Sequence, residues 1–182
     1  MGDKESLRNP AIRLYLTVGN NLNKMKKENL KYLLLSIAIC VVFAIIGGIL
    51  TGDSLENWFI EIKHPWFSLP LIGWYIVGGL YYIMAIAILY QLLIAKEGLQ
   101  RKIVIWLTIA MIAGNEFWNY LFFGLESTYA GFVGLLPFAL LVVILFIRLW
   151  KFQRKTAWIL FPYVMWLGYD LIWTYHLWIL NR

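Results

Sequence analysis

The sequence predicts an all-α integral membrane protein, a bundle of five transmembrane helices. Hydrophobic residues make up 62% of its 182 positions, whereas soluble domains have about 45–50% apolar residues. Five apolar stretches are long enough to cross a hydrocarbon core, which takes about 20 helical residues. Basic residues fall in alternate connections between these stretches, a pattern that an odd number of crossings explains. The predicted helices are 30–50, 70–93, 103–123, 130–150 and 157–180.

The distribution of Lys and Arg predicts the orientation of the chain. Seven lie before or at the start of the first helix, three between the second and third, and four between the fourth and fifth. The opposite side receives only Lys63 and Arg182. By the positive-inside rule, this places the N-terminus in the cytoplasm and the C-terminus outside. We expect a protein of a bacterial or archaeal cell membrane, with no nucleic acid partner despite the net charge of +6.

Residues 1–29 are expected to form a basic cytoplasmic segment ahead of a transmembrane domain at 30–182. This segment lacks the apolar core of a cleavable signal peptide. It fits either an amphipathic helix on the inner leaflet or a disordered basic tail. Cys40, the single cysteine, excludes an intramolecular disulfide.

The connection 51–69 is the longest loop and lies on the outer side. It is rich in aromatic and acidic residues, and loops longer than about 12–15 residues are often lids or binding loops. We expect it to cover the mouth of a pocket. Small residues that would let helices approach closely are Gly47, Gly48, Gly78, Gly79, Gly131 and Gly134.

Two acidic residues lie in the middle of apolar helices. Tyr163, Trp166 and Asp170 follow at steps of three or four residues and so share one stripe of the fifth helix. Asn115 and Trp118 do the same on the third helix, with Glu116 beside them. Each acid is 13 residues into its predicted span, about 20 Å from the inner boundary at about 1.5 Å per residue.

Acids at one depth in a low dielectric would not both stay ionised, and they would share a proton if they met. One interpretation is a polar floor of an aromatic pocket, where a protonated acid donates a hydrogen bond or a carboxylate receives a cationic ligand. The other is that each acid bonds a neighbouring helix and only stabilises the bundle. Both remain open for Glu116 and Asp170.

Motifs along the chain indicate a family. Taken together, they resemble the TspO/MBR family of translocator or tryptophan-rich sensory proteins, which are five-helix membrane proteins. The matching residues are Trp58-Phe59, Lys63-His64-Pro65-Trp66 and Leu69-Pro70 in the loop, Leu80-Tyr81 and Met84 in the second helix, Asn115, Trp118 and Phe122-Phe123-Gly124 in the third, and Pro162-Tyr163, Trp166, Trp178 and Asn181 in the fifth.

The resemblance implies a pocket open toward the outer loop, a tetrapyrrole ligand such as a porphyrin, and a homodimer. The ligand-binding residues that it implies are Trp58, Trp66, Tyr81, Asn115, Trp118, Tyr163 and Trp166, to which the mid-membrane acids Glu116 and Asp170 are added. The chain departs from the family pattern in two important places. The tryptophan expected at 77 or 78 is missing, with Trp74 about one turn earlier, and Asp170 stands where the family has a small residue.

We therefore expect a membrane receptor or carrier that binds an apolar planar ligand, with a tetrapyrrole as the leading candidate, under the loop between the first two helices. Its partners would be the lipid bilayer and this hydrophobic small molecule. The alternatives are a porphyrin-degrading enzyme, a proton-coupled transporter using Glu116 and Asp170, and a non-catalytic scaffold. We expect no catalytic residues, no metal site and no required cofactor, although porphyrin or haem could be a ligand. His64 and His176 are expected at the membrane interface.

Overall fold

A computed structural model describes the backbone of residues 10–182 and the side chains of residues 26–182. This part of the chain is all helical apart from turns and loops and contains no strand, which confirms the all-α prediction. Its elements are α2 (Pro10–Thr51), α3 (Trp58–Glu61), α4 (Leu71–Leu93), α5 (Leu99–Asn119), the π-helix η1 (Tyr120–Gly124), α6 (Thr128–Phe152) and α7 (Arg154–Leu180).

Three described helices are long and apolar enough to cross a membrane: Lys26–Thr51 of α2, α4 and α6. Five crossings were predicted, and two of those helices do not meet this measure of length and composition. α5 carries Glu116 between asparagines, and α7 interleaves Trp and Tyr with Asp170. Their polar groups lower the apolar character that identifies a span.

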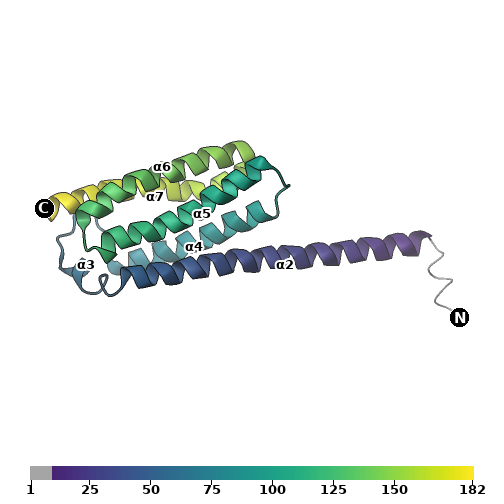
Figure 1. Ribbon diagram of the computed structural model, residues 1–182, viewed down its shortest axis with the longest axis horizontal. Helices are drawn as coiled ribbons and strands as arrows, with labels where there is room; N and C mark the ends of the chain where they lie inside the picture. Colours follow the sequence, from purple (N-terminus) through teal and green to yellow (C-terminus); the bar gives the residue numbers. More distant parts are fainter. Residues whose placement is uncertain (1–9) are drawn as a thin grey trace.

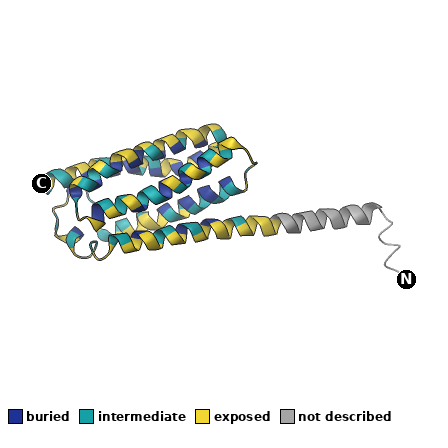
Figure 2. Ribbon diagram, viewed as in Figure 1, coloured by how far each residue is buried: buried dark blue, intermediate teal, exposed yellow. Residues whose placement is uncertain are grey.

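The five long helices form a closed ring in the order α2, α4, α7, α6, α5. The most extensive packing is between the consecutive helices α6 and α7, and α4 also contacts α5 inside the ring. Interior positions such as Ile88, Met111 and Val142 are fully buried. Many apolar side chains remain exposed on the outward faces (Figure 2), as expected for helices whose outer surface meets lipid rather than water.

The first helix begins earlier than predicted. α2 starts at Pro10, not near residue 30, and extends beyond the other helices (Figure 1). Proline suits a first helical position because its missing N–H would have no partner there. The residues around position 30 favour a helix, so the predicted boundary at 29/30 falls inside α2. Of the two interpretations of the N-terminal segment, a helix fits residues 10–29, and residues 1–9 lie outside the described residues.

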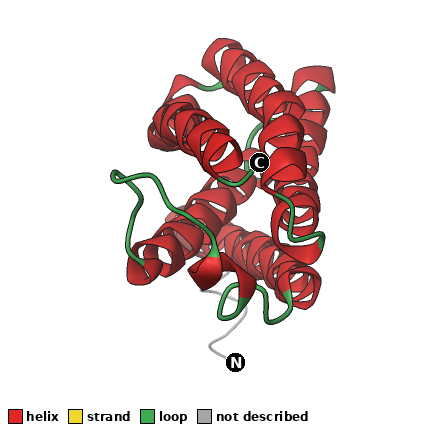
Figure 3. Ribbon diagram, turned by 90° about the vertical axis from the view of Figure 1, so that its left-hand side faces the viewer, coloured by secondary structure: helices red, strands yellow, loops and turns green. Residues whose placement is uncertain are grey.

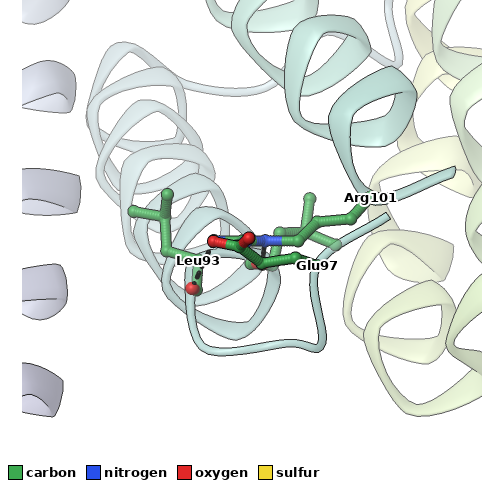
Figure 4. Close-up of polar contacts among 4 residues, drawn as sticks. Leu93, Glu97 and Arg101 are labelled. Carbon is green, nitrogen blue, oxygen red and sulfur yellow. Dashed lines mark hydrogen bonds and ion pairs between the residues drawn. The ribbon is translucent and has the colours of Figure 1, made fainter. Parts of the chain in front are cut away.

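The short connection between α4 and α5 is held by Arg101 (Figure 4). Its guanidinium donates from Nε to the carbonyl of Leu92 at 2.9 Å and from Nη2 to that of Leu93 at 2.7 Å. Glu97 lies 3.5 Å from Nη1. The last carbonyls of a helix have no partner within it, so Arg101 satisfies two of them and orients the start of α5.

The predicted third helix, 103–123, ends in a π-helical turn. The N–H of Leu125 bonds the carbonyl of Tyr120 at 2.9 Å, five residues back. A Cβ at Gly124 would lie 2.7 Å from the carbonyl oxygen of Leu50. Glycine is therefore needed where η1 meets the end of α2. The turn places Phe122 among the buried aromatic residues under the loop.

The loop between α2 and α4 is fastened to α7. Asn181 donates to the carbonyl of Lys63 and accepts from its N–H, both at 2.9 Å. Trp173 Nε1 donates to Ser68 Oγ at 2.9 Å, and Tyr169 donates to the carbonyl of Phe67 at 3.2 Å. Figure 3 views the bundle from the end that carries α3 and this loop. The predicted loop 51–69 thus contains the one-turn helix α3, and its second half is held against α7.

Candidate ligand-binding cavity

A cavity of about 540 Å³ lies among α2, α4, α5 and α7 beneath the start of the outer loop. Its lining includes the loop residues from Thr51 to Glu56, the α4 segment from Trp74 to Tyr82, and two residues of α6. Pockets for small molecules have volumes of about 300–1,000 Å³. The cavity therefore has the size of a small-molecule site.

Tryptophan rings form one wall. Trp74 of α4 has its ring centroid 4.3 Å from that of Trp173 and 5.8 Å from that of Trp166, both on α7. Trp118 of α5 also lines the cavity. Its Nε1 donates to the carbonyl of Gly131 at 2.9 Å, so the orientation of this indole is held by α6.

Two tyrosines mark the deeper part of the lining. The rings of Tyr81 and Tyr163 have centroids 5.0 Å apart. Tyr81 donates its hydroxyl to the carbonyl of Met111 at 3.2 Å, and Tyr163 donates to Asn115 Oδ1 at 3.4 Å. Both hydroxyls are therefore hydrogen-bonded, and the two rings present apolar surface to the cavity.

Glu116 lies behind this wall and does not line the cavity. Its carboxylate accepts hydrogen bonds from Tyr82 at 2.6 Å, from Asn115 at 3.0 Å and from Asn119 at 3.0 Å. It also rests against α2, since a Cβ at Gly47 would collide with Glu116 Oε2. Glu116 thus hydrogen-bonds to side chains of α4 and α5 and packs against α2 at Gly47.

Asp170 has a different environment. It lines the cavity and is 6% exposed, and its Oδ1 has no hydrogen-bond partner among the described residues. Trp74 Nε1, which also lines the cavity, has none either. No hydrogen bond joins Asp170 to Glu116 in the described part of the chain. Their similar predicted depth does not bring the two acids into contact, because Glu116 faces α2 and Asp170 faces the cavity.

The other predicted site residues fall into two groups. Those from the helical stripes line the cavity: Tyr81, Asn115, Trp118, Tyr163 and Trp166. Those from the loop do not. Trp58 packs edge-on against Phe122, with centroids 5.4 Å apart, and Trp66 is 95% exposed. Loop residues have no period from which their direction can be inferred, so motif order alone did not indicate that these two side chains lie outside the lining.

The interpretation above missed several lining residues. They include Tyr82, Phe123, Phe138 and the loop acids Asp53 and Glu56. Trp74 had a usable signal, because Trp74, Gly78 and Tyr81 follow at helical steps and share one face of α4. Trp74 thus brings an indole to the cavity one turn before Val77 and Gly78, which also line it.

The predicted small residues serve two purposes. A Cβ at Gly131 or Gly134 would lie within 2.4 Å of a side chain on the neighbouring segment, so these glycines allow close packing, as Gly47 does. In contrast, a Cβ at Gly48, Gly78 or Gly79 would meet nothing within 4 Å, and all three line the cavity. Packing was therefore the wrong expectation for the second set.

The histidines lie outside the lining, and each contacts a backbone carbonyl. His64 Nε2 is 2.7 Å from the carbonyl oxygen of Phe59, and His176 Nδ1 is 2.8 Å from that of Ile172. Within the described residues, no three His, Cys, Asp or Glu side chains come together as they would around a metal ion.

The apolar helices and the internal aromatic cavity define a class, the helical integral membrane proteins built around a cavity. The sequence profile of the TspO/MBR family matches residues 36–179, and the chain belongs to that family. It is similar to "Tryptophan-rich protein TspO" of Archaeoglobus fulgidus, with 25% identity over 155 residues, which cover 84% of this chain and 99% of that protein. These findings confirm the family resemblance read from the motifs.

Proposed function

We propose that this protein is a membrane receptor or carrier that binds an apolar planar ligand in the cavity, with a tetrapyrrole as the leading candidate. The observation that carries the proposal is the tryptophan wall formed by Trp74, Trp166 and Trp173, with Trp118 also in the lining. Flat, rigid indole faces bind planar rings with little loss of conformational entropy. Membership of the TspO/MBR family supports a binding role for this cavity.

The glycines support a flat ligand as well. Gly78 and Gly79 add a surface without side chains to the lining. A ring can approach the backbone closely at glycine. Together with a volume of about 540 Å³, this suits a rigid polycyclic molecule.

The proposal includes five crossings, made by α2, α4, α5 with η1, α6 and α7. The N-terminus would be cytoplasmic, and the loop with α3 would lie outside. Cysteines introduced in a Cys40→Ala background test this orientation. We expect Glu61→Cys to react with a membrane-impermeant maleimide on intact cells and Lys96→Cys to react only after permeabilisation. The reverse pattern would overturn the orientation.

Porphyrin binding is tested by titrating the purified protein with protoporphyrin IX and following tryptophan fluorescence. We expect saturable quenching and about a tenfold loss of affinity for Trp166→Ala, equivalent to about 1.4 kcal/mol. Trp106→Ala is the matched control because Trp106 is exposed on the outer face of α5, and it should keep the affinity. Quenching that does not saturate, or equal effects of both variants, would reject porphyrin as the ligand of this cavity.

The same titration distinguishes binding from degradation. A receptor or carrier leaves the porphyrin absorbance unchanged under illumination, relative to free porphyrin in the same detergent. Faster loss of absorbance with protein than without it would identify the enzyme alternative instead.

A further inference from the structure

We propose that the cavity selects planar aromatic ligands that carry a positive charge, and that Asp170 binds the charged group. This inference deepens the proposed function and depends on its aromatic cavity. It concerns a residue particular to this chain, since the family resemblance expects a small residue at this position.

The first support is an unpaired carboxylate oxygen. Asp170 is 6% exposed and lines the cavity, yet its Oδ1 has no hydrogen-bond partner among the described residues. A buried carboxylate oxygen without a donor is costly. Glu116, at the same predicted depth, has three donors. Asp170 Oδ1 can therefore still accept a hydrogen bond, whereas the carboxylate oxygens of Glu116 already do so. A donor can reach Asp170 from the cavity.

The second support is the charge of the lining. Three carboxylates line the cavity, Asp53 and Glu56 near the start of the loop and Asp170 on α7, while no Lys, Arg or His does so among the described residues. Asp53 and Glu56 are exposed, whereas Asp170 is buried. A cavity lined by one sign of charge raises the local concentration of the opposite ion. The lining therefore favours cations and disfavours anionic substituents.

The third support is the arrangement of aromatic rings around Asp170. Trp166 lies one turn before it on α7 and Trp173 lies three residues after it, and Trp74 contacts both indoles. Cations bind well over the faces of Trp rings, more strongly where water is excluded. Asp170 and these three indoles thus combine a charge partner and stacking surfaces within one site.

Three probes with one ring skeleton test the inference: acridine, 9-aminoacridine and acridine-9-carboxylate. At pH 7.5 the first is uncharged, the second is a cation and the third is an anion. Binding is measured by probe fluorescence in nanodiscs of zwitterionic lipid, so that the bilayer itself carries no net charge. We expect 9-aminoacridine to bind at least about tenfold more tightly than acridine, and the carboxylate to bind most weakly.

The variants assign this preference to a residue. Asp170→Asn keeps the shape and removes the charge, so the preference for the cation over acridine, both measured on this variant, should fall to about twofold or less. Asp170→Glu should retain a preference. Asp53→Asn with Glu56→Gln should slow association and weaken its salt dependence but keep the preference. Glu61→Gln, outside the lining, is the control for general changes of charge.

The outcomes separate this inference from the proposed function. Equal binding of 9-aminoacridine and acridine by the wild type, or a preference that survives in Asp170→Asn, overturns the inference but leaves an aromatic-binding cavity. Failure of all three acridines and of protoporphyrin IX to bind saturably rejects the proposed function itself. Thermal unfolding of each variant verifies that the preference is compared between folded proteins.

Discussion

Glu116 and Asp170 are both buried acids within the same helical bundle, yet their surroundings differ in every respect. Glu116 accepts three hydrogen bonds from side chains of α4 and α5 and fits against the backbone of α2 at Gly47. Asp170 has an unpaired oxygen and lines a cavity. Depth in the membrane therefore does not define the role of an acid. The role depends on the hydrogen-bond donors that surround the acid. Glu116 has three and stabilises the bundle, whereas an oxygen of Asp170 remains available to a ligand.

The largest expected effect is on Glu116. Glu116→Leu would leave Tyr82, Asn115 and Asn119 without their acceptor, so we expect a loss of about 2–4 kcal/mol in the free energy of unfolding. Asp170→Asn should change it by less than about 1 kcal/mol, because no hydrogen bond to Oδ1 is lost. Unfolding of both variants in mixed detergent micelles makes the comparison. Equal losses would end the distinction between the two acids.

The next effect compares two neighbouring glycines of α2, of which only Gly47 lies against Glu116. Gly47→Ala would place a methyl group in the space occupied by the carboxylate of Glu116, and we expect a loss of about 1–3 kcal/mol. Gly48→Ala, one residue later, meets nothing within 4 Å and should be neutral or slightly stabilising in a helix. The same unfolding assay measures both, and a larger loss for Gly48→Ala would contradict the packing described here.

A smaller effect on stability is expected where the loop between α2 and α4 is fastened to α7. Asn181→Ala removes both hydrogen bonds to the backbone of Lys63, and we expect a loss of about 1–2 kcal/mol at the loop. Trypsin cleaves after lysine, so cleavage at Lys63 should become faster. Arg182→Gln, beside it, is the control and should leave this cleavage unchanged. Unchanged cleavage in the Asn181 variant would show that Tyr169 and Trp173 fasten the loop without it.

The smallest effects compare two indoles of the lining. Trp118→Phe loses the hydrogen bond to the carbonyl of Gly131 and should destabilise the protein by about 1 kcal/mol more than Trp74→Phe. Trp74 Nε1 has no partner, so the latter change removes no hydrogen bond. Thermal unfolding measures stability, and protoporphyrin IX titration shows whether the free N–H contributes to binding. Equal stability of both variants would contradict this assignment.

Helical periodicity explains what could be predicted. Trp118, Tyr163 and Trp166 line the cavity as their spacing indicated, because a residue every three or four positions returns to the same face of a helix. Composition likewise predicted an all-helical membrane protein with long apolar segments. The family motifs were sufficient to identify the TspO/MBR family.

Rotation of each helix about its axis and the path of the loop could not be predicted. Spacing placed Glu116 and Asp170 at one depth, but no sequence pattern states that Glu116 turns toward Gly47. Trp66 belongs to a conspicuous motif and is 95% exposed, since its direction depends on hydrogen bonds between the loop and α7. Such contacts between distant residues carry no local signal.

Three of the four glycines in the lining give this cavity an adjustable volume. A Cβ at Gly48, Gly78 or Gly79 would meet no neighbouring atom, so alanine at any of them occupies cavity space without disturbing a packed contact. Single substitutions can therefore reshape the ligand space in small steps at little cost to the fold. Alanine substitutions at these three glycines can therefore change the ligand preference of the protein without changing how its helices pack.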